Sequence, residues 1–157
     1  MNKSNYPDMR LLVPHTDSMM LLDRVISADQ DSLCAEVIIK PESLFYSKND
    51  EGVGAWVGVE YMAQTIAAYA GYHALTHQKP AKIGFLVGTR RYECTKAFFA
   101  NGDRLQITAR SIFQADNGLA SFECTINNKI IDEYNQIASA TINAFLPDNI
   151  NEFLKQA

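Results

Sequence analysis

Charged residues are scarce in this chain of 157 residues. Asp, Glu, Lys and Arg together make up 20% of it, whereas hydrophobic residues make up 47%. That balance excludes a disordered chain, and the length favours one domain over residues 1–157, because two would each lie near the lower size limit for independent folding. The net charge is −4. An acidic chain of this kind argues against nucleic acid as a partner.

Cysteine is also sparse, and the N-terminal residues lack a secretory signal. Cys34, Cys94 and Cys124 lie far apart without a CxxC pair. This spacing argues against structural zinc and against a disulfide framework, so we expect the three to serve as small packing residues. The first ten residues have no apolar core of the kind a signal peptide needs. Both observations predict a cytoplasmic protein.

A long uninterrupted hydrophobic run is absent as well. Residues 52–78 come nearest, with Glu60 as their one charged residue. A carboxylate and two histidines would be costly in lipid, so we interpret the stretch as a buried helix and not as a membrane span. His73 and His77 are four residues apart, as in some metal sites, but no acidic or cysteine partner stands nearby at ligand spacing. We therefore expect no metal.

Periodicity predicts the remaining elements. Apolar residues recur at three- or four-residue spacing over 57–77, which predicts a helix, and alternate over 105–114 and 120–126, which predicts strands. The other expected elements are a helical turn at 8–12, extended segments at 21–28 and 33–40, a polar loop at 42–54, strands at 83–94 and 138–144, turns at 101–103, 117–118 and 127–128, and a short C-terminal helix at 148–157.

Small or apolar residues surround most of the axis of the predicted helix. Such a helix is buried on nearly all sides. A flat sheet cannot cover one helix all round, but a strongly curved antiparallel sheet can. The expected architecture is therefore α+β, with the hotdog fold: a curved sheet wrapped around one long central helix. Hotdog domains usually pair so that two sheets become continuous.

Three segments carry recognisable motifs: LVPHTDSMMLLDRV at 12–25, GVEYMAQ at 58–64, and GFLVG at 84–88 with NGDRL at 101–105. Together they resemble the β-hydroxyacyl-ACP dehydratases of type II fatty acid synthesis, and more closely the divergent branch associated with aryl polyene clusters. The segment GVEYMAQ resembles the start of that family's central helix. The resemblance implies dehydration of a 3-hydroxyacyl thioester to a trans-2-enoyl thioester, with Glu60 as a catalytic residue.

One position departs from the pattern of that family. Its catalytic histidine sits in a Gly-His-Phe-Pro-Gly loop, fourteen positions before the helix acid, where this chain has Tyr46. Dehydration needs a base near neutral pH, and His15 is our preferred candidate because histidine titrates in that range. Tyr46 is the second candidate, as a hydrogen-bond donor to the substrate or as a gate. Glu60 could instead be a structural acid that complements the helix dipole.

The substrate-binding candidates lie around the helix start and on one strand. Gln64 follows Glu60 by one turn and should point the same way. Backbone amides at Gly58 and Val59 are candidates for an oxyanion hole. Arg90 and Arg91, near Lys96, form the one dense basic cluster, which would suit phosphopantetheine or the acidic surface of acyl carrier protein. A solvated strand end and simple packing are the alternative interpretations.

The resemblance implies acyl carrier protein as a partner, and pairing as a homodimer or with another hotdog subunit. It implies neither a metal nor a redox cofactor. Two other functions stay open. A hotdog thioesterase would use Glu60 to activate water. A non-catalytic subunit would support an active dehydratase, and Tyr46 is the feature that favours it.

Overall fold

The computed structural model describes residues 5–13, 19–78, 85–130 and 133–145. Their main element is a six-stranded antiparallel sheet in the order β1-β2-β7-β8-β9-β5. Three very short strands form a second sheet in the order β3-β4-β6. The six long-sheet strands are β1 Arg24–Ala28, β2 Ser32–Ile38, β5 Phe85–Cys94, β7 Arg104–Gln114, β8 Leu119–Ile130 and β9 Glu133–Phe145. The other elements are β3 Tyr46–Ser47, β4 Gly52–Gly54, β6 Phe98–Ala100, the 3₁₀ turns η1 Met9–Leu11 and η3 Ala55–Val57, and the helix α1 Gly58–Thr76.

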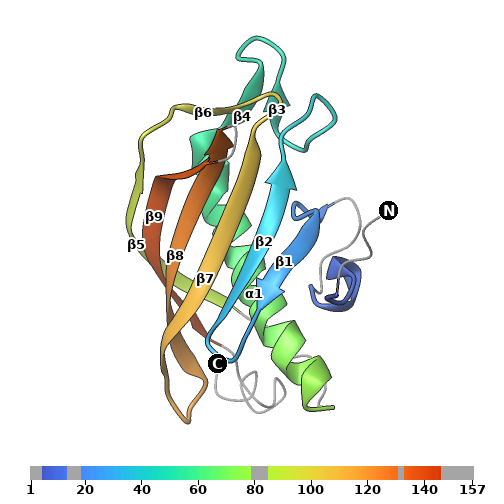
Figure 1. Ribbon diagram of the computed structural model, residues 1–157. Coiled ribbons are helices and arrows are strands. Elements are labelled where there is room, and N and C mark those ends of the chain that lie inside the picture. Colours follow the sequence, from blue (N-terminus) through green and yellow to red (C-terminus); the bar gives the residue numbers. More distant parts are fainter. Residues whose placement is uncertain (1–4, 14–18, 79–84, 131–132, 146–157) are drawn as a thin grey trace.

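The long helix α1 lies along one face of the curved sheet (Figure 1). Strand residues on that face form the core with it. In β8 and β9 the buried positions alternate along each strand, as a half-buried sheet requires: they are Ala120, Phe122, Cys124 and Ile126 in β8, and Ala138, Ala140, Ile142 and Ala144 in β9. This is the curved sheet around one helix that the sequence predicts.

Burial of α1 explains why its sequence carries so little charge. Eleven of its 19 residues are buried, among them Tyr61, Met62 and Gln64. Within the described residues, no helix combines the length and the apolar character needed to cross a lipid bilayer. The predicted helical turn at 8–12 corresponds to η1, and the predicted helix at 57–77 corresponds to α1 with η3 before it.

Three local predictions were wrong. Asn127 and Asn128 do not form a turn, because β8 continues through them and pairs them with Gln136 and Asn135 of β9. The segment 42–54 is not wholly irregular, since it contains β3 and β4. The hairpin at Asn117–Gly118 has a loop of three residues and not two, because the Ala115 N–H bonds the carbonyl of Leu119. Gly118 takes the positive φ of 97° that such a loop needs.

Other predictions fall on parts of the chain that the structure does not describe. They are the helix at 148–157, the start of the strand at residue 83, and the position of His15.

Candidate functional site

Glu60 lies in the first turn of α1 and is the one acidic residue there. Its side chain is half-buried. The residue that precedes the helix, Val57, makes no side-chain capping bond. A carboxylate in this position complements the positive end of the helix dipole. The same position also leaves the carboxylate partly open to a substrate.

Gln64 stands one turn after Glu60 and holds another segment of the chain against the helix. Its Nε2 donates a hydrogen bond of 2.8 Å to the Met19 carbonyl, and its Oε1 accepts one of 2.9 Å from the Leu21 N–H. The side chain is 1% exposed. Its Nε2 also lies 3.5 Å from Oε1 of Glu60. Gln64 therefore joins residues 19–21, which directly follow 14–18 in the chain, to the helix acid.

The start of α1 packs tightly against β5. A Cβ atom on Gly58 would lie 2.2 Å from the Tyr92 hydroxyl oxygen and 3.0 Å from Cδ1 of Ile126. The Tyr92 hydroxyl donates a 2.5 Å hydrogen bond to the carbonyl of Ala55, and the Gly58 N–H donates to the same carbonyl. Gly58 thus serves close packing, and its N–H already has an acceptor.

Tyr46 belongs to β3 of the small sheet and precedes the helix in the chain. It pairs with Val53 in β4, which leads into η3 and α1. The Tyr46 side chain is half-buried and packs against the main core. It therefore has a structural role as well as a place in the segment where the related family carries its histidine.

Arg90 and Arg91 lie on β5 and are exposed. Strand β5 is an edge strand, at the opposite edge of the sheet from β1. The pairing with β9 is irregular between Arg90 and Glu93, and Arg91 has a positive φ of 55°. The next residue, Tyr92, is the one that contacts Gly58. The basic pair therefore projects from the strand that packs on the helix start.

Asp23 and Arg24, at the start of β1, each bond a residue of β2. Nε of Arg24 donates a 2.9 Å hydrogen bond to Oε1 of Glu36, whose side chain is buried. Oδ2 of Asp23 accepts a 2.7 Å bond from the Ile38 N–H. These bonds fasten β1 to β2, which is consistent with a role at the start of a strand.

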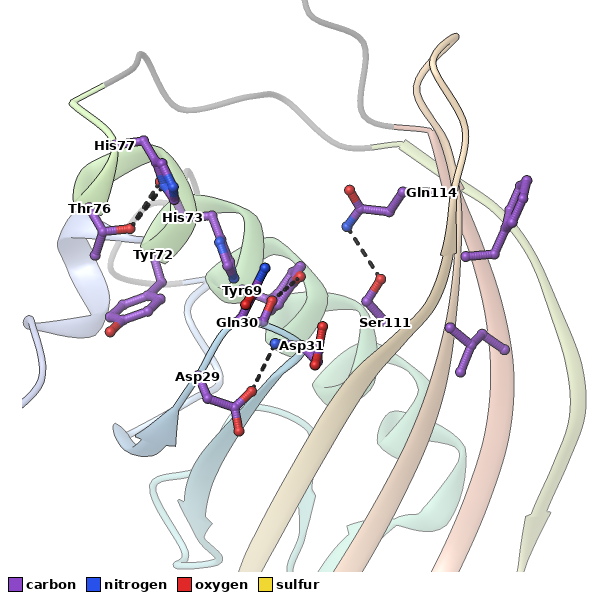
Figure 2. Close-up of a pocket in the computed structure, with 12 residues that line it drawn as sticks. Asp29, Gln30, Asp31, Tyr69, Tyr72, His73, Thr76, His77, Ser111 and Gln114 are labelled. Carbon is purple, nitrogen blue, oxygen red and sulfur yellow. Dashed lines mark hydrogen bonds between the residues drawn. The ribbon is translucent and has the colours of Figure 1, made fainter.

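A groove of about 850 Å³ lies at the C-terminal end of α1, far along the helix from Glu60 (Figure 2). His73 and His77 line it, with their rings stacked 6.0 Å apart and inclined by 15°. Nδ1 of His77 lies 2.8 Å from the His73 carbonyl oxygen. In the part of the chain that the structure describes, no group of three or more His, Cys, Asp or Glu is placed to hold a metal. The groove does not contain Glu60, so we do not assign the reaction to it.

Two tyrosines at the helix start were not identified from the sequence. The Tyr92 hydroxyl of β5 contacts Gly58, and Tyr61 is among the residues that line a cavity of about 350 Å³. Tyr61 lies within the GVEYMAQ segment, but nothing in that segment singles it out, and Tyr92 belongs to no motif. Both tyrosines are identified by contacts between residues that are distant in the sequence.

Comparisons with known proteins identify the architecture. A model of the ApeP-like family, described as ApeP dehydratase, matches residues 7–155. The structure resembles the dehydratase heterocomplex ApeI:P from Xenorhabdus doucetiae, with 23% identity and a TM-score of 0.85 over 97% of this chain and 98% of that chain. No curated protein matches the sequence significantly.

Thioesterase-type proteins are more distant structural matches. Zebrafish thioesterase superfamily member 2 has 16% identity and a TM-score of 0.62, over 85% of this chain and 87% of that one. The PaaI protein of the Escherichia coli phenylacetic acid degradation operon has 12% identity and a TM-score of 0.58, over 78% and 77%. At such identities the structural matches establish the fold alone, which is the hotdog fold.

Proposed function

The chain belongs to the ApeP dehydratase family, and we propose that it removes water from a 3-hydroxyacyl thioester carried by acyl carrier protein, with Glu60 as a catalytic residue. The product is a trans-2-enoyl thioester. The observation that supports this most is the position of Glu60, in the first turn of an otherwise uncharged helix and beside a fully buried amide. Loss of water changes no oxidation state overall, so the proposed reaction needs no redox cofactor.

The reaction needs an acid and a base on the two sides of one carbon–carbon bond. A base takes the proton from C2, the C2–C3 double bond forms, and the C3 hydroxyl accepts a proton and departs as water. We assign the proton donor to Glu60 and the base to His15, because a carboxyl group and an imidazole can exchange protons near neutral pH. Tyr46 is the second candidate for a substrate contact.

Gln64 supports this pairing by position. It bonds the backbone at Met19 and Leu21, a few residues after His15, and it contacts Glu60 on the same face of the helix. This amide holds the backbone of residues 19–21 against the helix that carries Glu60, without itself exchanging a proton. We therefore propose Gln64 as a positioning residue.

The thioester carbonyl would lie at the N-terminus of α1. Partial positive charge there stabilises an oxygen that becomes negative when C2 loses its proton. Since the Gly58 N–H already bonds Ala55 and the residue packs against Tyr92, we propose the Val59 amide as the donor. Arg90 and Arg91 would receive the phosphopantetheine or the acidic carrier surface.

We further propose that the protein works in the cytoplasm and pairs with a second hotdog subunit, either a copy of itself or a different chain. Two exposed aromatic side chains beside the helix start support this pairing, because the second subunit would cover them. Phe45 and Trp56 are 46% and 67% exposed, and their rings meet edge to face at 5.3 Å. Tyr46, at the position of the expected histidine, favours a second possibility, in which this chain assists an active partner without reacting itself.

Product analysis tests the proposal. The purified protein is incubated with a 3-hydroxyacyl thioester of acyl carrier protein, alone and together with any hotdog subunit that co-purifies. Enoyl thioester formed by the protein alone is the expected result. Free thiol would identify a thioesterase instead. Enoyl product that requires the second subunit, and persists when Glu60 is changed, would identify this chain as the assisting one.

A further inference from the structure

The groove at the C-terminal end of α1 lies between the last turns of that helix, the turn that joins β1 to β2, and the end of β7 (Figure 2). Its volume of about 850 Å³ falls within the range of about 300–1,000 Å³ that small-molecule sites usually have. Glu60 lies in the first turn of the same helix, so the groove is separate from the proposed reaction centre. A ligand could bind here whether or not the protein dehydrates thioesters.

Hydrogen bonds fix the three walls of the groove relative to one another. The Tyr69 hydroxyl donates a 2.8 Å bond to the Gln30 carbonyl, which ties α1 to the β1–β2 turn. The Ser111 N–H donates a 2.7 Å bond to the Asp31 carbonyl, which ties β7 to the same turn. Oδ1 of Asp29 accepts a 2.8 Å bond from the Asp31 N–H, which holds the turn itself. The groove is therefore largely preformed, as ligand sites usually are.

The groove carries negative charge. Asp29 and Asp31 are exposed on its β1–β2 wall, and none of the described residues that line it is Lys or Arg. Hydrogen bonds from the N–H groups of Asp31 and Ser32 hold the pKa of Asp29 below its ordinary value, so this carboxyl group is ionised at neutral pH. The last carbonyl groups of α1 add partial negative charge at the same end of the helix. All three contributions favour a cation over an anion.

His73 brings an unpaired nitrogen to the same place. Its Nε2 is buried and has no hydrogen-bond partner among the described residues. The centre of its ring lies 4.4 Å from that of Tyr69, and in Figure 2 the ring points from α1 toward the β1–β2 turn. Leaving a buried polar atom unpaired is costly, so such atoms nearly always have a partner. A neutral imidazole can accept a hydrogen bond from an ammonium group there, once the exposed side chains around it rotate.

The groove does not suit a metal ion. Histidine and aspartate are common metal ligands, but nowhere in the described ranges are three or more His, Cys, Asp or Glu placed to hold one. The volume of the groove is also far larger than a single ion needs. An organic cation matches both the size and the charge of the groove.

We propose that this groove binds a small organic amine in its ammonium form. The ammonium group would donate hydrogen bonds to the carboxylates of Asp29 and Asp31 and to Nε2 of His73. The carbon chain would lie along the rings of Tyr72 and His77, which also line the groove. Hydrogen bonds between charged partners are stronger than neutral ones, and aromatic faces attract cations. A neutral compound of the same size would gain neither contribution.

Titration calorimetry at pH 8, where imidazole groups are ordinarily neutral, tests the proposal. The probes are 1,4-diaminobutane and 1,4-butanediol, which have equal numbers of heavy atoms and differ in charge. We expect the natural protein to bind the diamine and not the diol. Asp31→Asn should weaken diamine binding about tenfold. Asp50→Asn removes the same charge between β3 and β4 and should leave binding unchanged. Equal binding of the two probes, no binding of either, or equal weakening by both substitutions would overturn the proposal.

Nitrogen NMR of the histidine rings tests the contact with His73. The chain has three histidines, so each ring signal can be assigned to its residue. The diamine should shift the His73 Nε2 signal, and the diol should not. His73→Phe keeps an aromatic ring but removes the nitrogen, so it should weaken diamine binding about tenfold, with circular dichroism as the check on folding. Diamine that binds without shifting the His73 signal would overturn the site.

One further probe separates two sources of the ammonium group. Nα-acetyl-lysine amide presents it at the end of a protein side chain, whereas the diamine is a free small molecule. We expect the diamine to bind more tightly, because both of its ends are charged and the groove has two carboxylates. Tighter binding of the lysine derivative would assign the groove to a lysine of a partner protein and would overturn the assignment to a small amine.

Discussion

At the scale of single residues, Gln64 is a buried glutamine whose side chain bonds the backbone of another segment of the chain. Its amide has one donor and one acceptor satisfied by backbone groups of residues 19–21, and its Nε2 also reaches Glu60. Both backbone partners would be left unpaired without it. The side chain therefore ties stability and the geometry of the reaction centre together.

Gln64→Leu should destabilise the protein strongly. An unpaired buried donor or acceptor costs about 1–3 kcal/mol, so loss of both bonds should lower the free energy of unfolding by about 2–4 kcal/mol. Urea denaturation measures this. Gln114→Leu is the matched control, because Gln114 is exposed and its Nε2 donates a 3.3 Å hydrogen bond to the Ser111 hydroxyl. Similar urea midpoints for the two variants would contradict the role of Gln64 in holding residues 19–21 against the helix.

The three thiols should differ in reactivity. Burial raises the pKa of Cys124 to about 12 and also raises the pKa of Cys34. Only the thiolate is alkylated, so at pH 8 about one Cys124 in ten thousand is reactive at any moment. We expect iodoacetamide to label the half-buried Cys94 first, and the other two only after unfolding. Peptide mapping that found Cys124 labelled first in the native protein would contradict the packing of β8.

The sequence predicts some of the residues around the helix start and not others. Glu60 stands out because its surroundings lack charge, and Gln64 follows from helical spacing. Tyr61 and Tyr92 do not stand out, since one tyrosine among seven has no local signature. Their roles arise from contacts across the fold. The separation of His15 and Glu60, which the acid–base assignment uses, remains a prediction.

At the scale of elements, the junction of α1 with β5 sets how closely the helix start approaches the sheet. Gly58 faces Tyr92, Ile126 and Phe99, all within 3.2 Å of where a Cβ would lie. Tyr92 is held in turn by its bond to Ala55. A glycine is thus required here by space and not by backbone conformation.

Gly58→Ala should lower the free energy of unfolding by about 2 kcal/mol, because overpacking a tight contact costs more than the helix gains from alanine. Gly88→Ala is the control, since no atom lies within 4 Å of its added Cβ. Adding Tyr92→Phe removes the oxygen that the new methyl meets. The double variant should therefore lose less stability than the two single changes combined. Strict additivity in urea denaturation would argue against the contact.

Helices and strands were predictable where the hydrophobic periodicity was long. Alternation over 105–114 and 120–126 predicted β7 and the first part of β8, and helical spacing over 57–77 predicted α1. The pattern failed at Asn127–Asn128, because asparagine favours turns locally but the ladder with β9 continues through both residues. It also failed for β3, since a strand of two residues has no detectable period.

At the scale of the whole molecule, the basic pair lies on the edge strand β5, and the same strand packs against the helix start through Tyr92. This arrangement suits a carrier protein that docks on the sheet edge next to the proposed reaction centre. The fold is that of the family, and the sequence predicts it through the buried helix. The order of the strands in the sheet was not predicted from the sequence and comes from the structure.

Arg90→Ala combined with Arg91→Ala should raise KM about tenfold for a substrate on acyl carrier protein, because surface charge chiefly affects encounter with a charged partner. The same variant should leave kcat/KM for a pantetheine thioester nearly unchanged. Arg110→Ala, at an exposed arginine on β7, is the control. An equal loss with both substrates would place the arginines in the reaction and not in carrier docking.

The central claim is that Glu60 takes part in the dehydration, and one comparison tests it most directly. Glu60→Gln keeps the size and polarity of the side chain but removes its acidic proton, whereas Glu133→Gln makes the same change at an exposed position of β9. We measure kcat/KM for enoyl formation from a 3-hydroxyacyl thioester, with circular dichroism as the check on folding. Loss of the proton donor predicts a fall of about 10²–10⁴-fold for Glu60→Gln and none for Glu133→Gln. A folded Glu60→Gln protein with the activity of the natural one would contradict the account.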